Sequence, residues 1–327
     1  MNNKRLLGHL LCIACVLVWG TTFISTKVLL VDFTPVEILF YRFLLGLATL
    51  YMCPGRLRLT GIRQEIYMAL AGLSGVSLYY LLENIALTCT TAANVGIIVS
   101  AAPFFTILLS HLLRQEDRLT PAFLMGFLFA ITGIGLITVT DMSQVYFHPL
   151  GDFLAVMAAL LWAVYSLLMK KIHTFGYAIL PVTRRIFLYG LLFMIPALFL
   201  LPFSPQTARF SKPVNLANFL YLGIVACAVC FCIWNYALKL LGTMTASVYI
   251  YAMPVITMAA SALILREPIT LPALAGTLLT ITGLMLSENK LPFTKVIHRC
   301  THPDNPHETP EYSGMDSYPH AENNKSD

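Results

Sequence analysis

Ten long apolar runs, separated by short polar stretches, make up most of the chain. They cover residues 6–26, 33–53, 66–88, 92–113, 121–140, 150–169, 178–202, 216–238, 243–265 and 270–287. Each run is close to the ~20 residues that a helix needs to cross a bilayer core about 30 Å thick. Open sheets are excluded because unpaired backbone groups in lipid cost too much free energy. The pattern predicts an all-α integral membrane protein of ten transmembrane helices.

Composition and charge fit this class and add an orientation. The chain is 57% hydrophobic and 11% charged, against roughly 45–50% and about 25% in soluble domains. With a cytoplasmic N-terminus, sixteen of the 21 Lys and Arg residues fall on the cytoplasmic side, as the positive-inside rule requires. We therefore expect a multi-pass protein of the cytoplasmic (inner) membrane with both termini in the cytoplasm. The net charge of +5 is then a topology signal, and no nucleic-acid partner is expected.

The two halves of the chain repeat each other. "YLLENIAL" at 80–87 aligns with "FCIWNYAL" at 231–238, and the order of matches is kept over most of the chain. Shifts of 143 to 151 residues pair Gly8 with Gly151, Trp19 with Trp162, Lys27 with Lys170, Arg42 with Arg185, Asn84 with Asn235, Pro103 with Pro254 and Glu116 with Glu267. We expect five-helix repeats at 6–140 and 150–287, with 288–327 a polar, disordered cytoplasmic tail. Five helices per half imply opposite insertion, the inverted-repeat plan of secondary transporters.

These residues also carry a family resemblance. The stretch "LLCIACVLVWGTTFISTK" and the helix-loop-helix pattern from "TAANVGIIVSAAPFF" to "ITGIGLI", echoed by "TASVYIYAMPVITMAASALILREPIT", resemble the two EamA domains of the drug/metabolite transporter superfamily. The resemblance covers about residues 6–287. It implies a ten-helix permease, commonly an exporter of amino acids or other small metabolites. It also implies a central cavity lined by the third, fourth, eighth and ninth helices.

Glu83 is the first candidate for a substrate-binding residue, because it lies inside the third apolar run. An ionisable group at such depth costs at least ~2.5–3.5 kcal/mol, so it should face the bundle or a watery cavity. It is either a structural acid, protonated or paired with Arg42 or Lys27, or a cavity acid that binds a cationic group or carries a proton. Its repeat partner is Trp234, so the scaffold itself does not require an acid there.

The other candidates carry a structural and a functional interpretation each. Asn84 and Asn235 either form hydrogen bonds between helices or contact the substrate. Pro103 and Pro254 are either kinks that packing tolerates or hinges. Trp19 and Trp162 belong to interfacial belts or take part in gating or stacking. Arg42 and Arg185 are candidates for pairing or gating. The remaining predicted cavity residues are Tyr80, Trp234 and Tyr249.

Several function classes are excluded or disfavoured. The chain has no nucleotide-binding loop and no metalloprotease motif, so we expect no catalytic residues, no cofactor and no metal site. The "GLSG" of residues 72–75 fits an intramembrane serine protease, but small residues in a membrane helix are common. The prediction is a gradient-driven permease that exports an amino acid or other small metabolite by alternating access, with protons as a possible coupling ion. An uncoupled facilitator is the alternative, ahead of a membrane scaffold or an intramembrane enzyme. Oligomeric state is left open.

Overall fold

The computed structural model describes residues 3–55, 61–113, 149–241, 252–267 and 269–287, together with 121, 125–130, 132–133, 136, 246 and 249–250. All regular structure in these ranges is helical. The predicted fifth segment (121–140) lies mostly outside the described residues, as do Glu116 and the tail from residue 288. The part of the chain described here holds seven helices long and apolar enough to span a membrane, and two shorter apolar ones.

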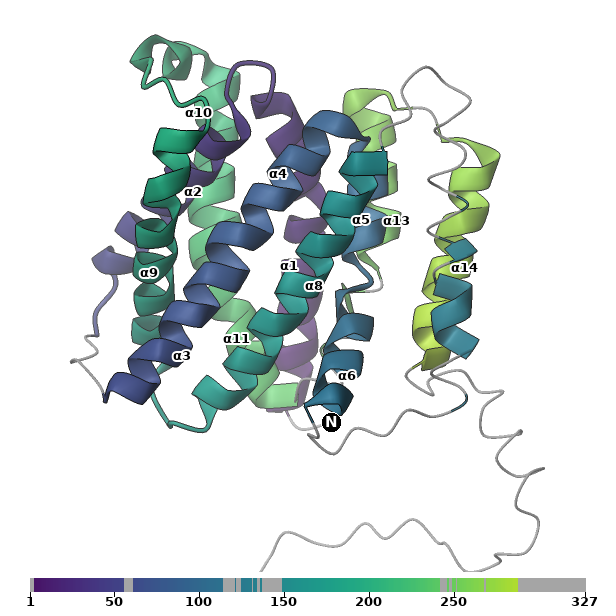
Figure 1. Ribbon diagram of the computed structural model, residues 1–327, viewed down its shortest axis with the longest axis horizontal. Coiled ribbons are helices and arrows are strands. Elements are labelled where there is room, and N and C mark those ends of the chain that lie inside the picture. Colours follow the sequence, from purple (N-terminus) through teal and green to yellow (C-terminus); the bar gives the residue numbers. More distant parts are fainter. Residues whose placement is uncertain are drawn as a thin grey trace, which may run out of the picture. The chain divides into compact units, whose positions relative to one another are not determined.

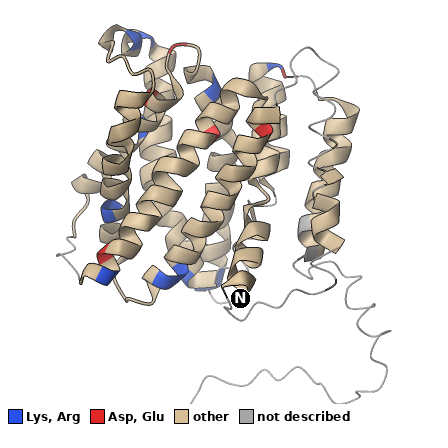
Figure 2. Ribbon diagram, in the orientation of Figure 1, with Lys and Arg blue, Asp and Glu red and all other residues tan. Residues whose placement is uncertain are grey.

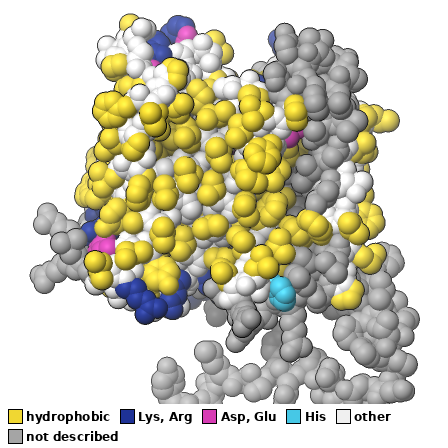
Figure 3. Space-filling model, viewed as in Figure 1, with side chains coloured by type: hydrophobic (Ala, Val, Ile, Leu, Met, Phe, Trp, Pro, Cys, Tyr) yellow, Lys and Arg dark blue, Asp and Glu magenta, His cyan; other side chains and the backbone are white. Residues whose placement is uncertain are grey.

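The helices of the first half are α1 (Asn3–Leu29), α2 (Pro35–Met52), α3 (Ile62–Gly72), α4 (Tyr79–Cys89), α5 (Ala92–Val99) and α6 (Ala102–Leu112). Those of the second half are α8 (Pro149–His173), α9 (Ile179–Leu200), α10 (Pro213–Leu220), α11 (Cys230–Leu241), α13 (Met253–Ala260) and α14 (Leu271–Ser287). These ranges agree with eight of the predicted runs to within a few residues, and the first part of the run predicted at 243–265 lies mostly outside the described residues. Hydrophobic side chains cover the middle of the face in Figure 3, and charged residues lie mostly toward the two helix ends (Figure 2).

Two of the long helices contain a π-helical stretch. Leu73–Leu78 joins α3 to α4, and Tyr221–Val229 joins α10 to α11. The two stretches overlap when the sequence is shifted by 151 residues. A π-helical turn places one extra residue in the helix and changes which face the following residues present. In the first half this stretch directly precedes the turn that holds Glu83.

Helices of one half pack mainly on helices of the other. In Figure 1, α4 runs beside α8, and α3 crosses near α9. The pairs with extensive contact include α4 with α8, α1 with α11, α3 with α9, and α5 with α13. The α3–α9 crossing is close because Gly72 faces Gly190: a Cβ on Gly72 would lie 2.6 Å from the backbone oxygen of Ile186. The space between the halves is therefore the core of the molecule.

"GLSG" belongs to this crossing. Ser74 donates a hydrogen bond to the carbonyl of Leu70 within its own helix (2.8 Å), and Gly72 makes the contact with α9. A Cβ on Gly75 would lie 2.3 Å from the ring of Tyr165 on α8. These small residues permit close helix packing, as the structural interpretation predicted.

Arg184 of α9 caps the end of α2. Its Nε donates to the carbonyl of Leu50 (2.7 Å), and its terminal nitrogens donate to the carbonyls of Cys53 and Gly55. The last carbonyls of a helix have no partner within the helix. One buried guanidinium from the second half thus donates hydrogen bonds to the carbonyls at the end of a helix in the first half.

Candidate functional site: a cavity between the two halves

A small cavity lies between the halves, in the upper part of the bundle as drawn in Figure 1. Its lining residues are Trp19, Thr22, Phe23, Tyr79, Tyr80, Glu83, Val99, Ala102, Trp162, Ile250 and Met253. Its volume is about 30 Å³, which gives room for roughly one or two water molecules and excludes a metabolite.

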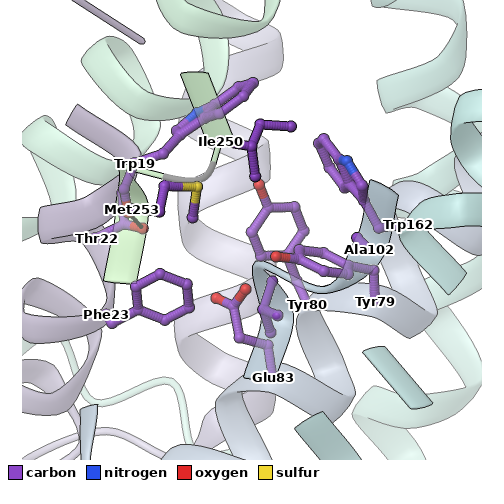
Figure 4. Close-up of a pocket in the computed structure, with 11 residues that line it drawn as sticks. Trp19, Thr22, Phe23, Tyr79, Tyr80, Glu83, Ala102, Trp162, Ile250 and Met253 are labelled. Atoms are coloured by element: carbon purple, nitrogen blue, oxygen red, sulfur yellow. Dashed lines mark hydrogen bonds between the residues drawn. The ribbon is translucent and has the colours of Figure 1, made fainter. Parts of the chain in front are cut away.

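Glu83 is the acidic group of this cavity. It is 1% exposed and lies six residues before the end of α4, which is about 9 Å along the helix axis. Figure 4 shows its carboxylate directed into the space near Phe23, Met253 and Tyr80. The hydroxyl of Tyr79, one turn earlier, donates a hydrogen bond to it. Its Oε1 atom has no hydrogen-bond partner among the described residues, although buried polar atoms are nearly always paired.

Arg42 lies behind this wall of the cavity. It is 1% exposed, and its guanidinium carbon is 4.3 Å from the centre of the Tyr80 ring. Its Nε donates to the sulfur of Cys227 (3.4 Å), and it interacts electrostatically with Glu83. Nη1 has no partner within the described ranges. Of the two partners expected for Glu83, Arg42 is therefore the one that approaches it, while Lys27 pairs with Glu267.

The aromatic side chains form one continuous group around the cavity. Trp19 meets Trp162 edge to face at 5.9 Å and Trp234 at 5.1 Å. Tyr79 is 4.5 Å from Tyr80 and 5.0 Å from Trp162. Trp19 and Trp162 both line the cavity, which is the position that the gating or stacking interpretation requires.

Both predicted prolines lie beside helix breaks that reach the cavity. The fourth helix ends as α5 at Val99 and restarts as α6 at Ala102, with Pro103 in its first turn. In the second half, Pro254 stands in the first turn of α13, which follows a break at Ala252. Residues one and four positions before each proline line the cavity: Val99 and Ala102 in the first half, Ile250 and Met253 in the second. Sequence reasoning missed these four residues, although the repeated prolines were a signal for them.

The other predicted site residues do not line the cavity; Asn84, Trp234 and Asn235 are buried, and Tyr249 is half-buried. Asn84 donates to the carbonyl of Pro35 (3.0 Å) and ties α4 to the start of α2. Asn235 is hydrogen-bonded to Tyr165, and Trp234 touches the cavity only through Trp19. The hydroxyl of Tyr249 lies 2.7 Å from Nδ1 of His9, toward the beginning of α1. The hydrogen bonds of the two asparagines agree with the structural interpretation of both.

Ion pairs join the halves at both ends of the bundle. At the upper end, the Glu267 carboxylate accepts hydrogen bonds from the amides of Ala92 (3.2 Å) and Ala93, and lies 3.7 Å from the Lys27 ammonium. We call Lys27–Glu267 the upper ion pair. At the lower end, Arg185 lies 3.4 Å from Glu65; this is the lower ion pair.

Comparison with known proteins places this arrangement in a family. The model of the EamA-like transporter family matches residues 6–139 and again residues 149–288. An uncharacterized transporter of Archaeoglobus fulgidus is 30% identical over 89% of this chain and 99% of its own length. A crystal structure of a protein with 18% identity, covering 86% of this chain and 97% of the other, superposes with a TM-score of 0.62 and shows the same fold.

Two further relatives carry more specific names. A probable terminal-alkyne amino-acid exporter of Streptantibioticus cattleyicolor is 26% identical over 83% of this chain and 90% of its own length. A probable amino-acid metabolite efflux pump of Escherichia coli is 25% identical over 88% of this chain and 96% of its own. With both halves matched by the family model, the chain belongs to the EamA-like transporter family and is a multi-pass membrane transporter rather than an enzyme.

Proposed function

We propose that the chain is a gradient-driven exporter of an amino acid or another small metabolite, and that its substrate site is the cavity at Glu83. The observation that carries the proposal is a small cavity between the halves, lined from both of them, with a buried carboxylate oxygen left without a partner among the described residues. The names of the two amino-acid efflux relatives support the substrate class. We place the protein in the cytoplasmic membrane with both termini inside.

The proposed mechanism is alternating access between two halves that insert in opposite directions. The π-helical stretches in the third and eighth helices and the breaks before Pro103 and Pro254 occur at nearly the same offset of 151 residues. Broken helices at the midplane, one from each repeat, are the usual setting of a substrate site in inverted-repeat transporters. The proposal is that the breaks act as hinges on which one half rocks against the other.

The two ion pairs would open in turn. Side chains of the upper pair are 31% and 14% exposed, and those of the lower pair 16% and 14%. Pairs that water can reach are each worth about 0–1 kcal/mol. Each of these two pairs can therefore break at a small cost in free energy, while substrate binding or a gradient decides which pair does so.

Transport measurements decide whether export is coupled to an ion. Glu83 carries a proton in the coupled version of the mechanism, and in the alternative the protein is an uncoupled facilitator. The substrate is first identified by comparing metabolites retained by cells with and without the protein. Purified protein in liposomes then receives that substrate with and without an imposed pH gradient.

A coupled exporter moves the substrate uphill when a gradient is imposed, and Glu83→Gln abolishes the uphill movement. Asp32→Asn is the matched control, because Asp32 is an acid at the upper surface that pairs with Lys212. Equilibration without uphill movement would establish the facilitator. Absence of any transported metabolite would refute the proposed function.

A further inference from the structure

We propose that the cavity recognises a positively charged organic ammonium group, with Glu83 as its counter-charge and the surrounding aromatic rings as its walls. The inference rests on the proposed function, because it names the chemistry that the same cavity selects. It goes beyond that function because it assigns the charge of the ligand and the residues that recognise this charge.

The first support is the acid-base character of the cavity lining. Among the described residues that line the cavity, Glu83 is the one carboxylic acid, and none is Lys, Arg or His. Its free Oε1 is a charge-bearing acceptor that needs a donor. A ligand carboxylate would meet this carboxylate at close range and be repelled, whereas an ammonium group would satisfy it.

The hydrogen-bonding capacity of an ammonium group fits this acid. An ammonium group has three donors and no acceptor. Oε1 of Glu83 is an acceptor that has no donor among the described residues.

The aromatic walls favour a cation as well. Trp19, Trp162, Tyr79 and Tyr80 all contribute rings to the lining. A cation over such a ring face gains about 0.5–2 kcal/mol when water is excluded. Arg42 shows the same preference within the protein, since its guanidinium lies 4.3 Å from the Tyr80 ring centre and next to Glu83.

Arg42 also bears on the remainder of the ligand. It balances Glu83 in the empty cavity, so an amine would add one uncompensated positive charge. An amino acid brings its own carboxylate and leaves the net charge unchanged. The ammonium group could thus belong to a free amine or to an amino acid, and the experiment separates these two sources.

Intrinsic fluorescence offers a direct binding assay. The chain contains three tryptophans, Trp19, Trp162 and Trp234, of which two line the cavity and the third packs on Trp19. Fluorescence of the purified full-length protein is titrated with phenethylamine, phenylalanine and hydrocinnamate, which share one ring and differ in charge. Isopentylamine, leucine and isocaproate repeat the comparison with an aliphatic body.

We expect saturable binding of an ammonium compound in at least one series, with the carboxylate-only compound bound about tenfold more weakly or not at all. Glu83→Gln should weaken ammonium binding about 10- to 100-fold, and Asp32→Asn should leave it unchanged. Equal affinity for amine and amino acid identifies a free cation as the ligand. Preference for the amino acid identifies a zwitterion.

Three results would overturn the inference: tighter or equal binding of the carboxylate-only compounds, unchanged affinity in Glu83→Gln, or no binding of any ammonium probe. If Glu83→Gln does not fold, the comparison of charge classes in the wild-type protein still decides. Binding is measured without transport or a gradient. A protein that exports its substrate but does not bind ammonium compounds more tightly than carboxylates would therefore refute this inference and leave the proposed function intact. Selective binding without any transport would refute only the proposed function.

Discussion

Arg209→Ala tests how much one buried ion pair stabilises the upper end of the bundle. Glu37, in the first turn of α2, is fully buried and accepts hydrogen bonds from both terminal nitrogens of Arg209 (3.0 and 2.9 Å). The carboxylate also accepts from the amides of Thr34 (2.8 Å) and Ser204 (2.7 Å). The hydrogen bonds that Arg209 donates to Glu37 raise the pKa of Arg209 above its ordinary value, so the guanidinium is charged at every accessible pH.

Removal of the arginine leaves a buried carboxylate without its counter-charge. Breaking a buried pair in this way usually costs about 3–5 kcal/mol. The Arg209 side chain is 18% exposed, and Glu37 keeps its two amide donors. We therefore expect a loss of about 2–3 kcal/mol in the free energy of unfolding.

Thermal unfolding of the detergent-solubilised protein, followed by tryptophan fluorescence, measures the effect. Arg209→Ala should lower the Tm clearly, and Lys212→Ala should hardly change it, because the Lys212 side chain is 62% exposed and surface pairs contribute about 0–1 kcal/mol. Adding Glu37→Gln to Arg209→Ala should recover part of the loss, since no buried charge then remains. Equal Tm values for Arg209→Ala and Lys212→Ala, or no recovery in the double variant, would refute the reasoning.

Two further changes test packing and acid sensitivity. Gly72→Ala places a methyl group 2.6 Å from the backbone oxygen of Ile186, so it should destabilise the α3–α9 crossing by about 1–3 kcal/mol; an unchanged Tm would mean that these helices separate freely. The hydrogen bond from Lys212 lowers the pKa of Asp32. The ion pair therefore stabilises the folded protein at pH values above the ordinary Asp pKa of about 3.9, and this stabilisation is lost as the pH falls below that value. Wild type should therefore exceed Asp32→Asn in Tm at neutral pH, and the difference should vanish in acid; a difference that persists in acid would contradict this assignment.

The helices were predictable from sequence because each apolar run must satisfy its own backbone. α2, for example, begins at Pro35 after an N-cap at Thr34 and ends at Met52, one or two residues from the expected ends. Local sequence also placed Glu83 deep in a helix and both prolines at irregularities. These features depend on residues within one or two turns.

The partners of these residues could not be predicted in the same way. Arg209 reaches Glu37 across 172 positions, and Arg184 reaches Leu50 across 134. Phe23 of α1 and Met253 of α13 were not predicted as cavity residues, because the lining depends on how helices far apart in the sequence pack together. The contacts of Trp19 with Trp162 and Trp234 depend on the same packing.

Arg184 has a consequence for how the chain is made. The first half of the chain leaves the ribosome and enters the bilayer before α9 exists, and at that stage the carbonyls of Leu50, Cys53 and Gly55 have no guanidinium to accept from. The end of α2 must then depend on water or lipid headgroups until the second half arrives. The two repeats are thus unequal partners during biosynthesis, because the earlier one completes its structure only when the later one supplies an arginine.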